Sequence, residues 1–467
     1  MDKEKNEDTN ITDQDIIFAT ANPSSYPSAI SIMRISGRGC LCVLSKCIKK
    51  PQTFIDRPNY LGLVQLIDPR GKVLIDKPMF VFFQSPRSYT GEEAAEIHLH
   101  GGDFIVQKLI SILTYLGFRY AYAGEFTRRA YLNGKMDLTE AEGVHEMIHA
   151  SSHQQWLAAS QLFSGKLKSC IDGLREQAIK SLSRLEAAMD FPDEEEVSHI
   201  EAKIINSEMV SLKVKIERLI RSYQSGRVSS KGLKVVVIGA PNAGKSTLMN
   251  YLLKKERAIV TDIPGTTRDY LEENILIQGR LISLVDTAGI RSTNDIVEQA
   301  GVEKAISLSE EADLVLCLKS SQAGNEDSYL IDKVTLSTRQ QVVVKVLTKV
   351  DLLSKKERQQ DPSIGFSISC VTGDGLKNLE DFLVSQVDGY VESISEQPFI
   401  SSSRHLAALE NALFDIDSFF TNQSKGLYEE ILASNIRSCT QQLEEIIGKV
   451  YVEDILDRVF SDFCIGK

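Results

Sequence analysis

One short stretch of the chain has the composition of a phosphate-binding loop. Residues 239–247 read GAPNAGKST, fit the pattern G-x-x-x-x-G-K-[ST] and follow the apolar run VVVI. In such a loop the backbone N–H groups wrap phosphates, while Lys245 reaches the β- and γ-phosphates and Ser246 offers its hydroxyl to Mg²⁺. A glycine-rich turn can match this pattern by chance, but the strand, loop and helix context favours a nucleoside triphosphate site.

Three later motifs follow apolar strands and indicate which nucleotide binds. The motif DTAG would place the carboxylate of Asp286 near a Mg²⁺-bound water. The motif TKVD ends in Asp351, whose carboxylate can accept two N–H donors from guanine and would repel the edge of adenine. The motif SISC, residues 367–370, would close over the base. Each motif is weak alone, but in this order they predict a GTP-binding domain.

Two details of the sequence bear on hydrolysis. Ile290 follows DTAG, so the side-chain amide that orients water in Ras-like enzymes is missing, and hydrolysis needs another source of order and positive charge. The stretch TDIPGTTRD, residues 261–269, offers carbonyl and hydroxyl oxygens beside the phosphate loop, which itself carries Asn242. Oxygen ligands of this kind suit a monovalent cation, which could take the place of an arginine finger.

The apolar patterns divide the chain into blocks that would position these motifs. Residues 12 to about 120 mix β-branched and aromatic runs with Gly and Pro, which is typical of a small α+β domain. Residues 232 to about 385 alternate apolar strands with helical patterns, the βαβ signature of a parallel sheet. Amphipathic helices flank that block, with apolar residues at steps of three and four within 171–219 and 406–463.

An inserted domain explains this order, because amphipathic helices must bury their apolar stripes against something. The expected fold is multidomain, with α+β and α/β parts and an all-helical domain split in two. The expected segments are an N-terminal α+β domain over 1–122, a first helical part over 123–228, an inserted G domain over 229–388 and a second helical part over 389–467. Three consecutive independent domains are the alternative.

Composition argues against several classes of protein. The chain has 467 residues, 42% hydrophobic and 25% charged, which are ordinary globular values. It shows no apolar signal region at the start and no run near the roughly 18 apolar residues of a membrane span, so we expect a cytoplasmic protein. The eight cysteines form no C-x-x-C pair and are expected to be free thiols. A net charge of −11 argues against nucleic-acid binding by bulk electrostatics, so any tRNA or DNA contact must be local or shared with a partner.

Several long motifs outside the central block are equally distinctive. They are RISG at 34–37, SYTGEEAAEIHLHGG at 88–102, AGEFTRRAYLNGKMDLTEAEG at 123–143 and the terminal FCIGK. Together with the G motifs they resemble the MnmE (TrmE) family of tRNA modification GTPases over essentially the whole chain. The resemblance implies a folate-binding-like N-terminal domain, a split helical domain and an inserted Ras-like P-loop G domain.

The resemblance also implies roles for residues of the G domain. The expected K⁺ ligands are Asn242, Thr261, Ile263 and Thr266, and the expected Mg²⁺ ligands are Ser246 and Thr267. In catalysis Lys245 would act on the phosphates, and Glu298 would orient the attacking water indirectly. The residues expected to contact GTP are Asn242, Ala243, Gly244, Lys245, Ser246, Thr247, Thr261, Thr266, Thr267, Asp286, Thr287, Ala288, Gly289, Thr348, Lys349, Asp351, Ser369 and Cys370.

Three residues depart from the family pattern. Thr348 stands where Asn is usual, which puts one contact to the base or to the phosphate loop in doubt. Cys370 replaces an Ala whose backbone N–H makes the base contact, so that change is expected to be harmless. Ala123 replaces a Pro before Gly124, which loosens that turn.

In the family the N-terminal domain binds a tetrahydrofolate one-carbon donor, and the matching positions are Arg34, Glu96, Lys135 and the terminal Lys467. A carboxylate suits the 2-aminopyrimidine edge of a pterin, and cations suit its glutamate tail or an acyl oxygen. Without the resemblance, Arg34 and Lys135 would be interpreted as solvated surface charges. His98 is expected to be structural, as is His100.

The last residues, FCIGK, allow several interpretations. A lipidation box is a poor match, because Gly466 and Lys467 are not its usual third and fourth residues. A frayed end is also disfavoured, because an apolar stripe of Ile455, Leu456, Val459, Phe460 and Phe463 would dock the final helix. The resemblance places the tail in the helical domain, facing the folate pocket, with Cys464 as a candidate nucleophile. A redox or packing role for this thiol stays equally open.

The resemblance implies a function in tRNA modification. The chain would be a K⁺-dependent GTPase, working as a homodimer with an FAD-dependent partner similar to GidA (MnmG). Together they would attach an aminomethyl-type group at C5 of the wobble uridine of tRNA, with the carbon from methylene-tetrahydrofolate. A ribosome-assembly GTPase of the Era or Der type is the alternative, but it would need a basic RNA-binding domain or a second G domain.

Overall fold

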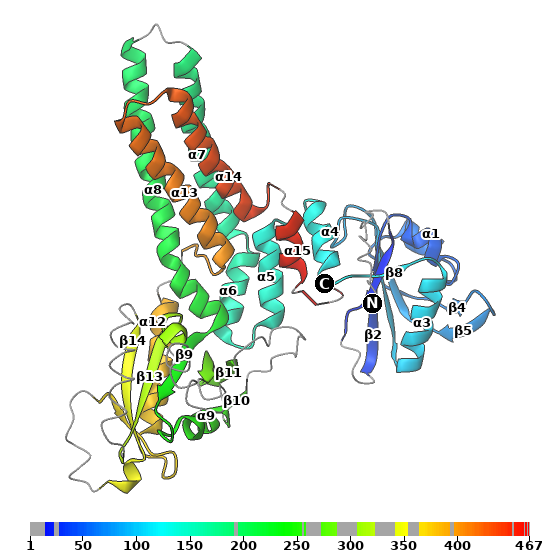
Figure 1. The fold of residues 1–467 in the computed structure, drawn as a ribbon. Coiled ribbons are helices and arrows are strands. Elements are labelled where there is room, and N and C mark those ends of the chain that lie inside the picture. The colour runs from blue at the N-terminus through cyan, green and yellow to red at the C-terminus, as the bar shows by residue number, and fades with distance from the viewer. Residues whose placement is uncertain are drawn as a thin grey trace, which may run out of the picture. The chain divides into compact units, whose positions relative to one another are not determined.

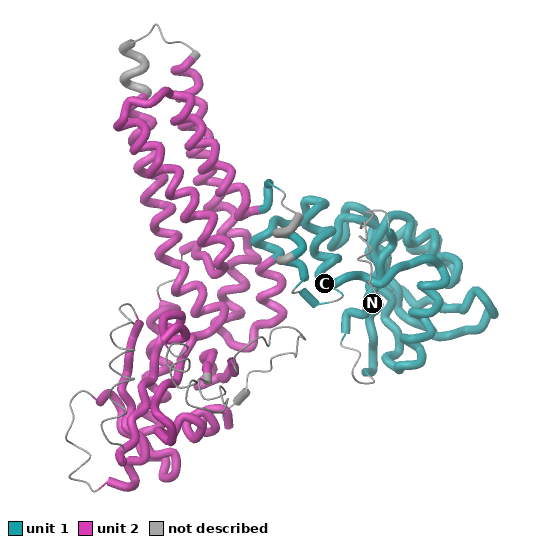
Figure 2. The backbone as a smooth tube through the Cα atoms, in the orientation of Figure 1, with its two compact units in different colours: residues 1–141, 448–467 teal, residues 142–447 magenta. Residues whose placement is uncertain are grey.

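The computed structural model describes most of the chain in two compact units. The described residues are 15–22, 28–190, 195–254, 256–257, 272–286, 306–322, 341–353, 364–392, 397–450, 453–461, 463, 464 and 466. Unit 1 contains Met1–Ala141 and Gly448–Lys467, and unit 2 contains Glu142–Ile447 (Figure 2). The two units are described separately below.

Unit 1 is built on a mixed six-stranded sheet (Figure 1). In spatial order its strands are β3 (Gly62–Leu63), β6 (Met79–Phe83), β7 (Ala94–Gly101), β2 (Ser28–Ser36), β1 (Ile17–Thr20) and β8 (Arg119–Tyr120). Only β1 and β8 pair in parallel; the other pairs are antiparallel. A separate hairpin joins β4 (Leu66–Asp68) to β5 (Val73–Asp76). The α+β prediction for this part of the chain is confirmed.

Three helices bury apolar residues in the core of this sheet. They are α1 (Cys40–Leu44), α2 (Gln52–Asp56) and α3 (Asp103–Tyr115). The longest, α3, buries Leu109 and Ile112 against sheet residues such as Phe18 and Ile97. Its apolar residues recur at steps of three and four, which is why one face of the helix can cover the sheet.

The C-terminal segment packs within unit 1. Helix α15 (Glu453–Ser461) lies against α4 (Glu125–Leu132), and Leu456, Phe460 and Phe463 share a buried cluster with Tyr131. The predicted docking of the apolar stripe is therefore confirmed for these residues.

The compact units divide the chain differently from the predicted boundaries, which assigned 123–141 and 448–467 to the helical domain. The reason is that α4 and α15 bury their apolar faces on each other. The G-domain boundaries at 229 and 388 stay a prediction.

The helical part of unit 2 combines segments from both sides of the G domain. Its helices are α5 (Leu138–His149, which begins in unit 1), α6 (His153–Phe163), α7 (Lys166–Asp190), α8 (Glu195–Lys231), α13 (Ser403–Ser424) and α14 (Glu429–Ile447). One core includes Ile171 of α7, Met209 of α8, Leu409 of α13 and Ile436 of α14. The two helical blocks thus share one core, and the predicted split helical fold is confirmed.

The G domain is a seven-stranded sheet between α8 and α13 in the sequence (Figure 1). In spatial order its strands are β10 (Glu256–Arg257), β11 (Glu272–Ile277), β12 (Arg280–Asp286), β9 (Leu233–Gly239), β13 (Leu314–Ser320), β14 (Val342–Thr348) and β15 (Phe366–Ser367). Strands β12, β9, β13, β14 and β15 are parallel neighbours. Their carboxyl ends therefore meet at one edge of the sheet, where doubly wound folds bind ligands.

Alternating side chains of β9 bury both faces of this sheet. Val235 and Val237 pack with residues of α9 (Lys245–Leu253) and α12 (Leu376–Glu392), whereas Val236 and Ile238 belong to a second cluster with Leu308. A strand buried on both faces needs the continuous apolar run that the sequence shows. In the described residues, no helix combines the length and the apolar character needed to cross a membrane.

Candidate functional site

The loop between β9 and α9 has the backbone of a phosphate-binding loop. A Cβ at Gly239 would lie 2.6 Å from the carbonyl oxygen of Leu318, so only glycine fits there. Asn242 and Gly244 have left-handed φ angles of 64° and 96°. Gly244 is also the N-cap of α9, so the unpaired N–H groups of the first helical turn are available to an anion.

Lys245 lies across this loop at the start of α9. Its Nζ donates hydrogen bonds to the carbonyl oxygens of Gly239 at 2.6 Å and Ala240 at 2.9 Å. Ser246 and Thr247 follow it and are exposed, as is Asn242 in the loop. The positive charge, two hydroxyls and an amide oxygen thus gather at the end of β9. Hard oxygen donors of this kind fit Mg²⁺ and K⁺.

Thr348, at the end of β14, ties that strand to the phosphate loop. Its Oγ1 donates to the carbonyl oxygen of Ala243 at 2.7 Å, and the residue is 3% exposed. Gly244 packs closely beside it, because a Cβ there would lie 3.5 Å from Thr348. The hydroxyl therefore supplies a tether to the phosphate loop in the position where Asn was expected.

Replacing Thr348 with Val is expected to weaken GTP binding roughly five- to tenfold, because a buried carbonyl loses its donor at a cost of about 1 kcal/mol. Valine keeps the shape and burial of the side chain, so the change isolates the hydroxyl. Titration with a fluorescent GTP analogue would measure the effect. Unchanged affinity in the valine variant would show that the tether does not position the phosphate loop.

The guanine-specific motifs meet at neighbouring strand ends. Ser369 Oγ donates to Asp351 Oδ1 at 2.6 Å and accepts from the backbone N–H of Val371 and Thr372, which orients the carboxylate. These contacts follow from the parallel pairing of β14 with β15. Lys349 begins the 3₁₀ helix η1 (Val350–Leu352) with a left-handed φ of 57°, and its carbonyl accepts from Ser321 Oγ.

Cys370 is half-buried beside this carboxylate. Burial, and next the charge of Asp351, raise the pKa of its thiol. The thiol is therefore neutral at physiological pH and adds no second negative charge to the base site.

The structure brings together only part of the predicted nucleotide site. The residues of that site that lie outside the described part of the chain are Thr261, Ile263, Thr266, Thr267, Thr287, Ala288, Gly289 and Glu298. The backbone of Asp286 ends β12, next to β9, but its side chain is not among those described. The predicted roles of these residues stay predictions.

A pocket in unit 1 contains two of the predicted folate residues. Arg34 of β2 and Glu96 of β7 are direct partners in the antiparallel register, and Arg34 Nε donates to Glu96 Oε1 at 3.1 Å. The remaining residues that line the pocket are Phe83, Arg87, Ser88, Tyr89, Thr90, Ala94, Ala95 and Phe126. The pocket thus joins aromatic faces to a carboxylate and two guanidinium groups. That combination suits a flat, polar heterocycle with an anionic part.

Aromatic rings fix the Arg34 side chain. Its guanidinium carbon lies 5.5 Å from the centre of the Tyr89 ring and 5.9 Å from that of Phe126. The Tyr89 hydroxyl shares a hydrogen bond of 2.9 Å with Thr127 Oγ1. Both aromatic walls are therefore attached to α4, which carries Phe126 and Thr127.

Lys135 is exposed, follows α4 in the chain and contacts the loop that lines one side of this pocket. Its Nζ donates to the carbonyl oxygen of Pro86 at 3.0 Å, next to the lining residue Arg87. Lys135 therefore lies near the pocket but does not line it. Lys467, the fourth predicted folate residue, lies outside the described residues.

The C-terminal tail reaches the same pocket. The carbonyl oxygen of Gly466 accepts from Arg34 Nη1 at 3.4 Å, and a Cβ at Gly466 would lie 2.7 Å from the carbonyl oxygen of Thr20. The carbonyl oxygen of Cys464 accepts from the N–H of Gly124 at 3.4 Å. Glycine at 466 is therefore required by close backbone approach, and the Cys464 thiol is half-buried nearby in the chain.

The two histidines singled out in the sequence have carboxylate partners. His98 Nε2 lies 3.4 Å from Glu96 Oε2, and His100 Nδ1 lies 2.7 Å from Asp76 Oδ1. His98 therefore contacts the pocket carboxylate of Glu96, which lies two residues earlier on the same strand, β7.

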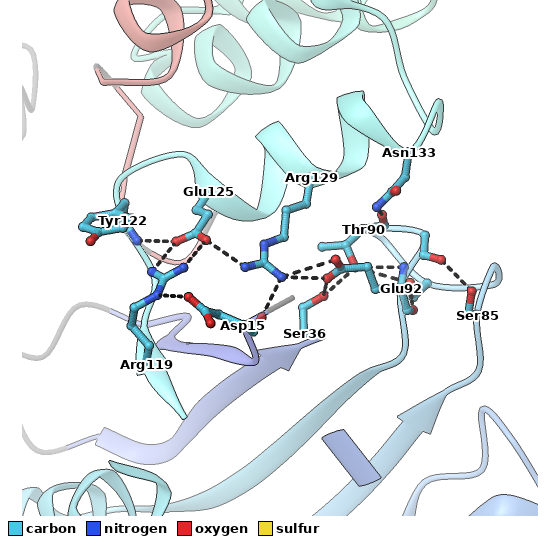
Figure 3. A network of polar contacts seen from close by, with 12 residues as sticks. Asp15, Ser36, Ser85, Thr90, Glu92, Arg119, Tyr122, Glu125, Arg129 and Asn133 are labelled. Atoms are coloured by element: carbon cyan, nitrogen blue, oxygen red, sulfur yellow. Dashed lines mark hydrogen bonds and ion pairs between the residues drawn. The ribbon is translucent and has the colours of Figure 1, made fainter. Parts of the chain in front are cut away.

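A network of charged residues beside the pocket, buried at Arg129 and Glu125 and half-buried at Glu92, was missed by the sequence reasoning. It joins Glu92, Arg129 and Glu125 through hydrogen bonds, with Arg129 between the two carboxylates (Figure 3). All three residues lie inside the long motifs at 88–102 and 123–143, so their charge was visible in the sequence. Their burial and their pairing were not, because those depend on how α4 packs.

Comparison with known proteins identifies the family. The protein-family model described as MnmE helical domain matches residues 138–464, and the family model described as GTP-binding protein TrmE N-terminus matches residues 16–135. Among solved structures, the chain is similar to the G domain of the T. maritima FeoB iron transporter, with 26% identity, a TM-score of 0.25 and coverage of 33% of this chain and 97% of that one.

Curated relatives match over nearly the full length. The protein named tRNA modification GTPase MnmE is 37% identical in Fervidobacterium nodosum, over 97% of this chain and 98% of the relative. The proteins of the same name in Moorella thermoacetica and Thermotoga maritima are 37% and 35% identical, over 97% of this chain and 99% and 100% of theirs. Because the matches span both units as well as the phosphate loop, the chain belongs to the MnmE (TrmE) family of tRNA modification GTPases.

Proposed function

We propose that this chain is a K⁺-dependent GTPase that acts in modification of the wobble uridine of tRNA. With an FAD-containing partner similar to GidA (MnmG), it would add an aminomethyl or carboxymethylaminomethyl group at C5 of that base. The carbon would come from methylene-tetrahydrofolate. The observation that carries the modification chemistry is the meeting of Arg34 with both Glu96 and the tail carbonyl of Gly466 at one pocket.

The nucleotide site would work through the residues at the end of β9. Lys245 would bind the β- and γ-phosphates, and Asp351, oriented by Ser369, would bind the guanine edge. Ser246 and Thr267 would hold Mg²⁺, and Asn242, with Thr261, Ile263 and Thr266, would hold K⁺. These cations supply positive charge to the phosphates in the transition state. Glu298 would orient water indirectly.

The pocket of unit 1 would bind the one-carbon donor. Glu96 would accept from the 2-aminopyrimidine edge of the pterin, while Arg34, Lys135 and Lys467 would pair with anionic or acyl oxygens. The aromatic walls, Tyr89 and Phe126, would exclude water from the ring. The donor supplies a carbon at the methylene oxidation level.

The C-terminal tail would bring a thiol to this pocket. Cys464 is our candidate nucleophile, because its backbone is held on α4 and Gly466, two residues later, contacts Arg34. The partners proposed for the assembled enzyme are a second copy of this chain, the FAD protein and tRNA. Nucleotide-driven pairing of two G domains would couple hydrolysis to the modification step.

GTP hydrolysis in K⁺ is expected to exceed that in Na⁺ by about tenfold or more, because ligands suited to K⁺ would hold the smaller Na⁺ less well and its positive charge would then be missing from the transition state. A phosphate-release assay at equal ionic strength would measure it. Calorimetry with 5-formyl-tetrahydrofolate should detect binding in parallel. Equal rates in both salts together with no folate binding would refute the proposed function.

A further inference from the structure

The buried network beside the pocket is organised around one guanidinium. Arg129, on α4, is 4% exposed, and its Nη2 donates to Glu125 Oε1 at 2.9 Å while Nη1 donates to Glu92 Oε2 at 3.2 Å. Nη1 also donates to the carbonyl oxygen of Asp15 at 2.9 Å. Figure 3 shows Arg129 lying between the two carboxylates. Because a guanidinium is rigid and planar, it sets how far these groups stand apart.

Glu92 transmits this constraint to the loop that lines the pocket. Its Oε2 accepts from Ser36 Oγ at 2.7 Å, and Ser36 Oγ shares a 2.7 Å hydrogen bond with Thr90 Oγ1. The carbonyl oxygen of Thr90 also accepts from Asn133 Nδ2 at 2.8 Å. Thr90 and its neighbour Tyr89 both line the pocket, so the position of Glu92 decides where this wall stands.

Glu125 transmits the same constraint to the N-terminal end of α4. Its Oε2 accepts from the N–H of Tyr122 at 2.8 Å and from Arg119 Nη1 at 3.0 Å, which closes the turn before the helix. Gly124, in that turn, donates its N–H to the carbonyl oxygen of Cys464. Burial acts to raise the pKa of Glu125, but the hydrogen bonds from Arg119, Tyr122 and Arg129 and the charge of Arg129 together outweigh it and lower the pKa below its ordinary value. The carboxylate therefore stays charged at neutral pH.

We propose that Arg129 is a positioning residue for the one-carbon donor pocket and for the Cys464 tail. It acts through Glu92 and Glu125, whose carboxylates it holds at a fixed separation. The pocket wall next to Glu92 is thereby coupled to the turn at Gly124 that binds the tail. The described contacts of its guanidinium are to these carboxylates and to Asp15, and it is absent from the pocket walls. The inference rests on the proposed function, because the pocket must bind a tetrahydrofolate.

Arg129→Lys in the full-length chain tests this inference. An ammonium group keeps the charge, but its single nitrogen cannot reach both carboxylates and the carbonyl oxygen at once. We therefore expect 5-formyl-tetrahydrofolate to bind at least about tenfold more weakly in calorimetry. Binding is measured at about 15 °C, well below the melting transition, where nearly every molecule is folded. A residue that only stabilised the fold would lower the melting temperature and leave the Kd unchanged.

Arg119→Lys is the matched control. Arg119 also donates hydrogen bonds to the carboxylates of Glu125 and Asp15, but its described contacts do not include Glu92. The Kd of Arg119→Lys for 5-formyl-tetrahydrofolate should stay within about twofold of the wild-type value, since the hydrogen bond from the Arg129 guanidinium to Glu92 is retained. Equal weakening in both lysine variants would overturn the proposal, because any loss of an arginine near α4 would then suffice.

Glu92→Gln keeps the test decisive should Arg129→Lys fail to fold. The amide preserves the shape of the side chain but removes the charge that Arg129 binds, so the Kd should also rise about tenfold. The variant that combines Arg129→Lys with Glu92→Gln should bind no more weakly than the weaker-binding of the two single variants. Unchanged Kd in both single variants would overturn the positioning role. Failure of the wild-type chain to bind 5-formyl-tetrahydrofolate would instead overturn the folate-binding part of the proposed function, so the two ideas fail on different results.

Discussion

Lys245→Ala is expected to lower GTP affinity by about 100-fold or more, a loss of about 3 kcal/mol, because charged hydrogen bonds to phosphate disappear. The Lys245 ammonium group is already held over the phosphate loop by the carbonyl oxygens of Gly239 and Ala240. It thus needs little rearrangement to meet a phosphate. Titration with a fluorescent GTP analogue would measure the change, and hydrolysis should fall with it.

Lys254→Ala provides the control for this prediction. Lys254 is exposed and forms the C-cap of the same helix, α9, whereas Lys245 begins it. Its removal also deletes one positive charge, but at the end of the helix far from the loop, so affinity should stay within about twofold. GTP affinity of Lys245→Ala close to that of Lys254→Ala would mean that the phosphates bind elsewhere.

Glu146→Gln is expected to remove a loss of stability that the chain suffers as the pH rises from about 4.5 to about 7. Glu146 lies half-buried on α5, where Ser230 Oγ donates to its Oε2 at 3.0 Å and Ser401 Oγ to its Oε1 at 3.4 Å. Burial raises the pKa of this carboxyl from 4.5 to about 7, with a smaller contribution from the charge of Glu142. Lys231 acts in the opposite direction. The fold therefore favours the protonated acid.

The direction of the pH effect follows from that raised pKa. Below about pH 4.5 the folded and unfolded chains both hold the proton, so the stability is at its full value. As the pH rises toward 7 the unfolded chain releases the proton first, and the free energy of unfolding falls by up to about 3 kcal/mol. Above about pH 7 the folded carboxyl also ionises and the loss levels off. Glutamine has no proton to release.

Calorimetric melting of the full chain between about pH 5 and pH 8.5 would measure this effect, since a few kcal/mol correspond to a shift of several degrees. The melting temperature of the wild type should fall progressively relative to that of Glu146→Gln up to about pH 7, and the difference should then stay constant, which isolates this one carboxyl. A difference that did not change with pH would contradict the assignment.

Glu142→Gln, one helical turn away, should have the opposite sign. Its Oε1 accepts from Arg404 Nε at 3.0 Å and its Oε2 lies 2.8 Å from His405 Nε2. Burial acts to raise the pKa of Glu142, but the Arg404 and His405 charges outweigh it and lower the pKa to about 2. Its stabilising contribution is thus present above about pH 4.5, where the substitution should lower the melting temperature.

Local sequence was sufficient for the phosphate loop because its chemistry lies in consecutive residues. The nine residues from Gly239 carry the glycines, the lysine and the hydroxyls that an anion needs, and an apolar strand and a helix flank them. The split helical fold was also predictable, since stripes on α7, α8, α13 and α14 had no other apolar surface to cover. Full-length relatives bear out the family that the long motifs indicated.

The tertiary structure decided which distant residues work together. Arg34 and Glu96 are opposite each other only because β2 and β7 pair in that register, and a shift of one strand by one residue would put the two side chains on opposite faces of the sheet. Thr348 reaches Ala243 only because β13 stands between β9 and β14. These contacts depend on sheet order, which a motif does not encode.

The placement of the tail and of Arg129 illustrates the same division. The sequence by itself determined that the final helix has an apolar stripe and that the chain ends in Cys-Ile-Gly-Lys. Only the packing of α15 on α4 decided that Gly466 lies against Arg34 and that Cys464 is held by Gly124. Likewise, the charges of Glu92, Glu125 and Arg129 are plain in the sequence, but their burial as one network comes from contacts between segments far apart in the chain. Residue types are local properties, whereas burial and partnership arise only when separate segments exclude water from the space between them.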